Sequence, residues 1–171
     1  MFESNYKILA HYNKTTNDWM NEYINKLSED QWNRIFNGYF KSIHELCSHI
    51  YICDFNWLKR FKSLRLFKTL SNTLFDTIYS FTEIIFEDRN EYSTKRRELD
   101  NIIIEYIDEL NKNDIESILR FTDSKGNKME RKMESLHMFN HETHHRGMIS
   151  LYLELMDIEN GFSGSLYKME S

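Results

Sequence analysis

The chain has 171 residues, of which 40% are hydrophobic, 15% aromatic and 29% charged, and its formal net charge is −5. This length is typical of one domain with a sizeable core, and the composition is that of a globular protein and not of a disordered one. With 27 acidic and 22 basic residues, the chain lacks the basic character that nucleic-acid binding requires. We therefore expect a single domain over residues 1–171 that does not bind nucleic acid.

Neither a membrane segment nor a disulfide framework is indicated. No apolar run approaches the roughly 18–20 residues that cross a membrane, and the opening MFESNYKILAHYNK lacks the basic start and continuous apolar stretch of a signal peptide. The two cysteines, Cys47 and Cys53, have a spacing that fits neither a CxxC motif nor a secreted disulfide pattern. We expect a cytoplasmic protein with reduced thiols and no membrane association.

The chain favours long helices, because it contains no proline and only five glycines. Two segments have apolar residues at three- and four-residue steps, the period of an amphipathic helix. One covers Ile43–Phe61 and begins at Ser42 or just before it. The other covers Leu9–Leu27, and its expected inner face includes three aromatic residues: Tyr12, Trp19 and Tyr23.

Residues 64–90 are rich in aromatic side chains and less regular, so we expect a long crossover with one short helix there. A third amphipathic helix is predicted to start near Ser93 and Thr94, which are good capping residues, and to reach Leu110. Its apolar residues again recur at helical spacing.

The remaining segment combines a turn with a fourth helix. The stretch RFTDSKGNKME has a turn signal with Phe121 and Met129 on its two sides, which predicts a short β-hairpin. The fourth helix is predicted from about Arg131 to Met156. We therefore expect an all-α four-helix bundle, with the long crossover between helices two and three and the hairpin between helices three and four.

A motif with metal-ligand spacing lies in the fourth helix. The string FNHETHHRG contains H-E-x-x-H, as His141-Glu142-Thr143-His144-His145, which in zinc proteases supplies two ligands and a general base. His141 and His145 lie one turn and about 40° apart on the helix, on its apolar side. Two imidazoles at this spacing can bind one metal ion. The alternative is a pair of core histidines satisfied by hydrogen bonds.

A metal site needs at least a third protein ligand, and this requirement tests the protease hypothesis. One protease class continues the motif with a glycine and then a histidine, at positions that here hold Met148 and Leu151. Glu154 lies about 180° around the helix from His145 and cannot share its metal. A zincin-type protease is therefore a poor alternative.

The second helix offers two histidines that could complete the site, His44 and His49. On a helical wheel they fall on opposite borders of the apolar face. Periodicity alone does not select one of them.

Three segments together resemble a known family. They are SIHELCSHIYICDFNWLKRF (Ser42–Phe61), RRELDNIIIEYIDEL (Arg96–Leu110) and LHMFNHETHHRG (Leu136–Gly147), and the opening HYNKTTNDWM adds a Tyr-Asn pair. In this order they resemble the DinB family of small, damage-inducible bacterial proteins, also grouped with YfiT-like proteins. The resemblance covers most of the chain. It implies a four-helix bundle with a metal held by three histidines, and frequent homodimers.

The resemblance also implies which residues bind the metal. The family pattern of a histidine, an aspartate five positions later and a tryptophan three after that matches His49, Asp54 and Trp57, which selects His49. His141 and His145 match the other two ligands. Nickel, zinc and iron all suit imidazole ligands, and three imidazoles leave coordination positions open, as is typical of a catalytic metal site.

Four residues are expected beside this site without binding the metal. Asp54 is expected to accept a hydrogen bond from a ligand N–H. His144 and Arg146 complete the family's His-His-Arg-Gly ending. Glu142 could orient a neighbouring ring, but we favour a solvated carboxylate with no catalytic role. Met148 departs from the family, in which glutamine often follows the glycine.

The function that the resemblance implies is that of a metal-dependent enzyme. Some relatives transfer a low-molecular-weight thiol, such as bacillithiol or mycothiol, to electrophiles, and others are hydrolase- or isomerase-like. A metal at the site could activate such a thiol, or water, near neutral pH. The alternatives are a non-catalytic stress-response or binding protein with a structural or vestigial metal, and the zincin-type protease.

Overall fold

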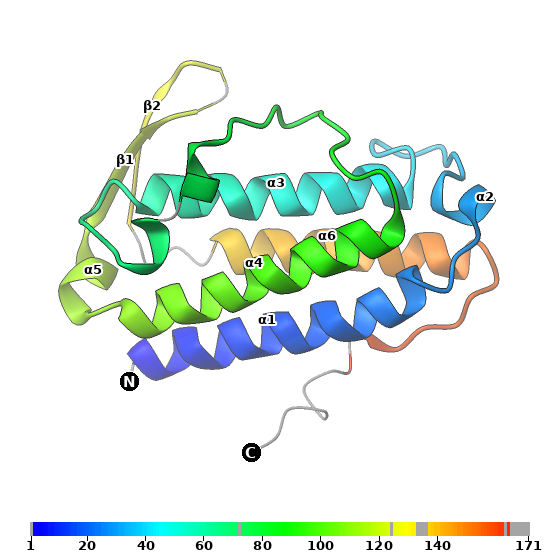
Figure 1. The fold of residues 1–171 in the computed structure, drawn as a ribbon, viewed down its shortest axis with the longest axis horizontal. Coiled ribbons are helices and arrows are strands. Elements are labelled where there is room, and N and C mark those ends of the chain that lie inside the picture. The colour runs from blue at the N-terminus through cyan, green and yellow to red at the C-terminus, as the bar shows by residue number, and fades with distance from the viewer. Residues whose placement is uncertain (1, 72, 124, 133–136, 163, 165–171) are drawn as a thin grey trace.

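Four long helices dominate the computed structural model of the protein, which describes residues 2–71, 73–123, 125–132, 137–162 and 164 (Figure 1). α1 packs most extensively against α4, and α3 against α6, while contacts between α3 and α4 and between α1 and α6 close the ring. The predicted all-α four-helix bundle is therefore confirmed. The long helices are α1 (Phe2–Ile24), α3 (Ile43–Phe61), α4 (Arg89–Glu109) and α6 (His137–Glu154).

The directions of the helices explain the long crossover. In Figure 1, α3 and α4 run the same way, and α1 and α6 run the opposite way. A helix as long as α3 extends roughly 28 Å, so the chain must return along the whole bundle before α4 begins. Residues 62–88 make this return. They contain two short 3₁₀ helices, η1 (Thr69–Ser71) and η2 (Thr73–Asp76), where the sequence predicted one short helix.

Short elements fill the other connections. The predicted hairpin is confirmed, and its register places Phe121 opposite Met129 on the two sides of the turn. Two short helices were not predicted. The elements are helices α2 (Glu29–Trp32) and α5 (Lys112–Glu116) and strands β1 (Ile118–Thr122) and β2 (Lys128–Lys132).

The start of α4 differs from the prediction. Asp88 caps this helix, because its carboxylate accepts hydrogen bonds from the backbone N–H groups of Asn90 (2.7 Å) and Glu91 (2.9 Å). Ser93, predicted near the cap, is buried more than a turn into the helix and donates its hydroxyl to Asn25. Aspartate and serine are equally favourable at an N-cap. Capping preference therefore did not distinguish Asp88 from Ser93 as the start of this helix.

The start of α6 also differs. The helix begins at His137 and not near Arg131, which belongs to strand β2, and it ends at Glu154, close to the predicted end at Met156. The part of the prediction that covers residues 133–136 lies outside the described residues. The hairpin therefore continues further along the chain than its turn signal indicated.

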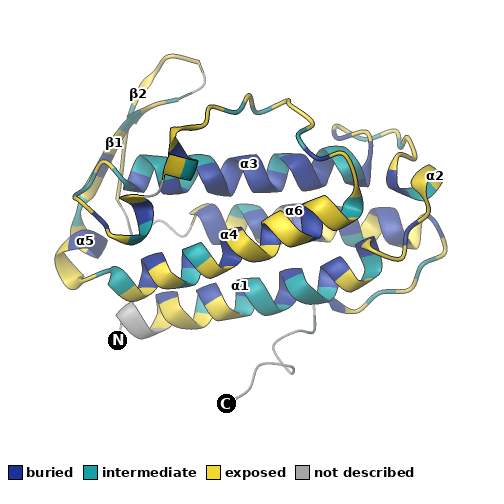
Figure 2. Ribbon diagram, viewed as in Figure 1, coloured by how far each residue is buried: buried dark blue, intermediate teal, exposed yellow. Residues whose placement is uncertain are grey.

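The inner face of α1 is more polar than its apolar pattern predicted. Trp19 and Tyr23 are only half-buried, whereas Asn13, Asn17 and Asn21, at four-residue intervals, are almost completely buried. Figure 2 shows the buried residues of the long helices turned toward the interior of the bundle. Because asparagine is polar, a search for apolar periodicity does not place this row on the buried side.

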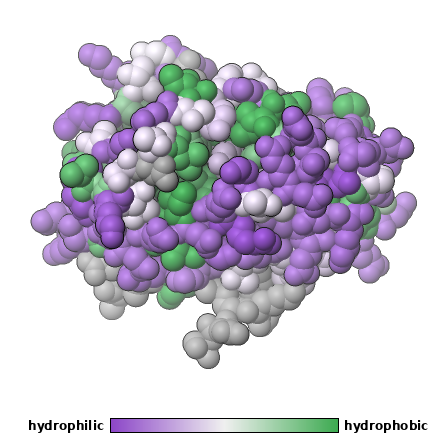
Figure 3. All heavy atoms as spheres, in the orientation of Figure 1, coloured by the Kyte–Doolittle hydropathy of each residue, from purple (hydrophilic) through white to green (hydrophobic). Residues whose placement is uncertain are grey.

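The surface in Figure 3 is largely hydrophilic along α1 and α4, and hydrophobic side chains gather above α4, near the crossover. Leu66, Ile78 and Ile84 of the crossover are among the exposed hydrophobic residues. Within the described residues, every helix is too short or too polar to cross a membrane.

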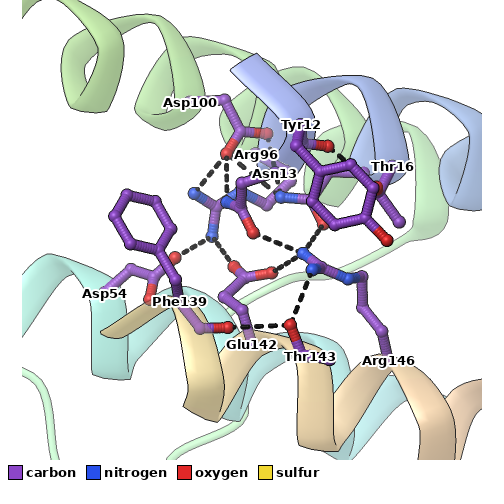
Figure 4. A network of polar contacts seen from close by, with 11 residues as sticks. Tyr12, Asn13, Thr16, Asp54, Arg96, Asp100, Phe139, Glu142, Thr143 and Arg146 are labelled. Carbon is purple, nitrogen blue, oxygen red and sulfur yellow. Dashed lines mark hydrogen bonds and ion pairs between the residues drawn. The ribbon is translucent and has the colours of Figure 1, made fainter. Parts of the chain in front are cut away.

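A buried cluster of charged side chains joins the helices at the centre of the bundle (Figure 4). The side chain of Arg96, on α4, has no exposed surface, and its guanidinium donates to three carboxylates. These are Asp54 of α3 at 2.9 Å, Asp100 of α4 at 2.8 Å and Glu142 of α6 at 3.0 Å. A buried charge is tolerated only where such partners satisfy it.

A second arginine connects this cluster to α1. Arg146 of α6 donates to Glu142 at 2.7 Å and to the side-chain oxygen of Asn17 at 3.1 Å, and it also contacts Asn13. The amide of Asn17 in turn donates to Asp100 at 3.1 Å. The buried asparagines of α1 therefore complete the hydrogen bonds of the cluster.

Burial and neighbouring charges shift the pKa values of the carboxyl groups in this cluster. Burial and the neighbouring Glu142 raise the pKa of Asp54 well above its ordinary value. Against the effect of burial, Arg96 and Arg146 hold the pKa of Glu142 below its ordinary value. Burial raises the pKa of Asp100 to about 6, which leaves it ionised at pH 7.

Replacing Arg96 with methionine should lower the free energy of unfolding by on the order of 3–5 kcal/mol, because it leaves buried carboxylates without their cation. Urea unfolding followed by circular dichroism measures this loss. Arg97→Met is the matched control, since Arg97 is exposed and its ion pair with Asp18 contributes at most about 1 kcal/mol. Equal losses in the two variants would contradict a stabilising role for the cluster.

Candidate metal centre

The candidate site lies between α3 and α6, which pack against each other and run in opposite directions. α3 carries His49 and Cys53 four residues apart, and α6 carries His141 and His145 at the same spacing. Residues four apart lie one above the other on the same helix face. Each helix therefore contributes two neighbouring donor groups to the space between them.

Ring nitrogens of three histidines converge in this space. The Nε2 atom of His141 lies 3.0 Å from Nε2 of His145 and 3.3 Å from Nε2 of His49. The ring centroids of His49 and His145 are 4.8 Å apart. The structure thus brings together the three residues that the family pattern implies as ligands, and their binding of a metal stays a prediction.

The distances between these nitrogens suit a shared metal ion. Two nitrogen ligands at about 2.0–2.1 Å from an ion and roughly 90–110° apart are roughly 2.9–3.4 Å from each other. The measured separations of 3.0 Å and 3.3 Å fall within this range. Hydrogen bonding alone fits less well, because a ring nitrogen has either one N–H or one lone pair. Nε2 of His141 can therefore satisfy only one of its two contacts in this way.

Cys53 is a further donor that apolar and cysteine patterns did not reveal. Its Sγ lies 3.5 Å from Nε2 of His49. The donor atoms of His49, Cys53 and His141 all lie within 4.8 Å of one another, so this group could hold a metal ion. The signal in the sequence is the four-residue step from His49 to Cys53, the same step that links His141 and His145. Both Cys47 and Cys53 are free and buried, as expected for reduced thiols.

The imidazoles are neutral at pH 7. Burial lowers the pKa of His49, and burial together with the neighbouring histidines lowers the pKa of His141 to about 4 and that of His145 to about 3. Neutral imidazole has the lone pair that a metal ion binds. Burial also raises the pKa of the Cys53 thiol to about 12, so this group is uncharged in the absence of metal.

Neighbouring groups restrain two of the rings. The backbone carbonyl of Phe81 lies 3.4 Å from Nδ1 of His49 and can accept its N–H, which leaves Nε2 free to face the other histidines. The ring of Phe40 packs against His49 at 4.6 Å and edge-on against His145 at 5.1 Å. Among the described residues, Nδ1 of His141 and of His145 has no hydrogen-bond partner.

The other histidines of the prediction lie outside this cluster. His44 stacks on Trp32 with ring centroids 4.7 Å apart, and its Nε2 contacts a backbone carbonyl at 2.7 Å. The structure thus places His49, and not His44, beside the histidines of α6. His144 is exposed, and its ring centroid lies 4.9 Å from that of His145.

The expectation for Glu142 was wrong. Its carboxylate is completely buried and binds Arg96 and Arg146, so it is an internal ion-pair partner and not a solvated surface group (Figure 4). With both oxygens engaged, it is also badly placed to act as the general base of a protease. Asp54, expected to accept from a ligand N–H, contacts Arg96 instead. Both residues belong to the buried cluster around Arg96.

Acid should destabilise the metal-free protein. The folded state holds the pKa of His141 at about 4 and of His145 at about 3, below the ordinary 6.5, so the unfolded state binds protons first as the pH falls. Stability present at pH 7 should be lost between about pH 6.5 and 4; because both rings are partly exposed, solvent screening reduces the full linkage of about 1.4 kcal/mol per pH unit for each histidine, and we expect a loss on the order of 2–3 kcal/mol. Urea unfolding of chelator-treated protein across this range measures the loss. The variant His141→Gln/His145→Gln should show a flatter profile, and an unchanged slope would assign the loss to other groups.

Comparison with known proteins identifies a family. The chain matches no curated protein and no solved structure. The model of the DinB family matches residues 1–160, which include all four long helices and every residue of the candidate site. The chain therefore belongs to the DinB family.

Proposed function

We propose that the protein is a metal-dependent enzyme of the transferase or hydrolase type, in which His49, His141 and His145 hold one divalent nickel, zinc or iron ion. The observation that carries this proposal is the approach of His141 Nε2 to Nε2 of His145 (3.0 Å) and of His49 (3.3 Å). Membership of the DinB family supports the same ligand set.

The preferred reaction is transfer of a low-molecular-weight thiol to a small electrophile. A bound ion would lower the pKa of a thiol or water that reaches it and so supply a nucleophile near neutral pH. In the transfer, the thiol sulfur forms a bond to the electrophilic carbon, the leaving group departs with its bonding electrons, and the thiol proton passes to solvent. Three imidazole ligands leave a position open for such a substrate.

The residues of the chain prepare the ligands for this role. Phe40 packs against the rings of His49 and His145 and restrains their positions. Glu142, next to His141 on α6, is fixed by two buried arginines. Rigid placement of ligands by neighbouring groups raises metal affinity, because less ordering is needed on binding.

Cys53 decides between this proposal and its main alternative. We propose that the thiol stays beside the ligands without binding the ion, so that the site remains open. Binding of Cys53 together with three histidines would give four protein ligands, the closed tetrahedral arrangement of a structural zinc site. That outcome would favour the non-catalytic stress-response or binding protein.

Single substitutions of His49, His141 or His145 by alanine should each lower the affinity for Ni²⁺ or Zn²⁺ by at least about 100-fold, since loss of even an outer partner costs about 10–100-fold. Calorimetric titration and elemental analysis should give one ion per chain for the parent. His11→Ala is the matched control, because His11 is an exposed residue of α1. Stoichiometric metal in all three variants would refute the ligand set.

If Cys53 is not a ligand, the Cys53→Ser variant should keep its metal. The Co²⁺ form of the parent should then lack the near-ultraviolet sulfur-to-cobalt absorption. A band that is present in the parent and absent from Cys53→Ser would show that the thiol is a ligand.

Thiol transfer tests the function itself. Metal-loaded protein should turn over at least one of bacillithiol, coenzyme A and glutathione with a panel of electrophiles, and Cys53→Ser should retain this activity while His141→Ala loses it. Absence of turnover with every thiol, at full metal occupancy, would favour the non-catalytic alternative. The protease alternative requires casein cleavage that disappears in Glu142→Gln, and the burial of Glu142 argues against it.

A further inference from the structure

A pocket of about 280 Å³ lies beside the candidate metal centre, between the last turns of α3, the β-hairpin and the start of α6. Its volume is close to the lower end of the range for small-molecule sites. The described residues that define its chemistry are Trp57, Arg60, Phe121, Asp123, Arg131 and His137.

Arg60 packs against two aromatic rings of this pocket. Its guanidinium carbon lies 4.6 Å from the centroid of the Trp57 ring and 4.3 Å from that of Phe121. The two ring centroids are only 5.5 Å apart, so both rings adjoin the guanidinium from one side and do not enclose it. Arg60 is half-buried, and among the described residues its side chain has neither an ion pair nor a hydrogen-bond acceptor.

The carboxylate of the pocket is engaged elsewhere. Oδ1 of Asp123 accepts hydrogen bonds from the backbone N–H groups of Lys125 (2.9 Å) and Asn127 (2.8 Å), and Oδ2 accepts from the Asn127 amide (3.0 Å). These bonds build the hairpin turn. Arg131 adds a second positive charge to the lining. Among the described residues, the pocket therefore has more positive than negative groups, and the Arg60 guanidinium forms no ion pair, although the charge of Asp123 acts on it at longer range.

Aromatic contacts connect this pocket to the histidine cluster. The His137 ring lies 5.2 Å from Trp57 and 5.9 Å from His141, between centroids. On α3, Arg60 follows Cys53 by two turns, roughly 10 Å along the helix. A molecule bound to Arg60 could thus extend past Trp57 and His137 toward His141.

We propose that this pocket binds the anionic end of the substrate, a small organic carboxylate or phosphate with a flat or apolar body. The edge of Arg60 would donate two parallel hydrogen bonds to the anion, a geometry that suits carboxylate and phosphate alike. The body would lie against Trp57 and His137, with its reactive group at the histidine cluster. The inference rests on the proposed function for the identity of the ligand as substrate, whereas anion binding itself requires no metal.

Titration of the metal-loaded full chain with benzoate, phenyl phosphate and the neutral analogue benzamide tests this inference by calorimetry. At least one anion should bind saturably and benzamide should not, and the anion that binds more tightly identifies the preferred group. Arg60→Gln should weaken binding at least tenfold, and Arg60→Lys, which keeps the charge but loses the planar fork, should lie between parent and Arg60→Gln. Arg120→Gln is the matched control, because Arg120 is an exposed hairpin residue paired with Glu130.

Two outcomes would overturn the inference: no saturable binding of either anion, or equal binding by parent and Arg60→Gln. Circular dichroism melting establishes that the variants fold, and the lysine variant carries the test if Arg60→Gln does not. Repeating the titration after metal removal separates the two proposals. Metal binding without anion binding would refute this inference alone, and anion binding without metal binding would refute the proposed metal centre alone.

Discussion

The side chain of Arg96 carries a fully buried positive charge, and side chains from all four long helices together balance it. Asp54, Asp100 and Glu142 bind it directly, Arg146 binds Glu142, and Asn17 of α1 binds Asp100. A network of this kind stabilises the fold when its charges are paired, because an unpaired charge in the interior is costly. Its geometry therefore restricts how α6 can rotate and shift relative to α3 and α4. The positions of the histidines on α6 depend on this restriction.

The H-E-x-x-H string of α6 serves two different purposes on two faces of one helix. His141 and His145 lie about 40° apart on the helix and face α3. Glu142 and Arg146 each follow one of these histidines and are rotated by about 100° from it, toward the buried cluster. In a zinc protease the glutamate of this string acts on the substrate. Here the same residue anchors the helix that carries the two histidines. The spacing is shared between the two kinds of protein, and the surroundings of the glutamate differ.

Two rows of side chains, one on α3 and one on α6, face each other. Together they form a candidate metal centre and a candidate substrate pocket. His49, Cys53 and Trp57 on α3 lie opposite His141 and its neighbours on α6. Near the middle of the helices the rows present uncharged nitrogen and sulfur donors. Toward the hairpin they present aromatic rings and an arginine that forms no ion pair with any of the described residues. Metal binding and substrate anchoring are thus assigned to adjacent turns of the same two helices.

The sequence by itself determined the features that depend on local spacing. Helical periodicity predicted the four long helices, the turn signal predicted the hairpin, and the four-residue step placed His141 and His145 together on one face. The family pattern added His49, which precedes His141 by 92 residues in the sequence. Only the tertiary structure decided what depends on distances between helices. It showed that Asn13 and Asn17 are buried and that Glu142 is an ion-pair partner. Each of these side chains is polar, and its burial is favourable only because a partner from another helix satisfies it, which no local pattern contains.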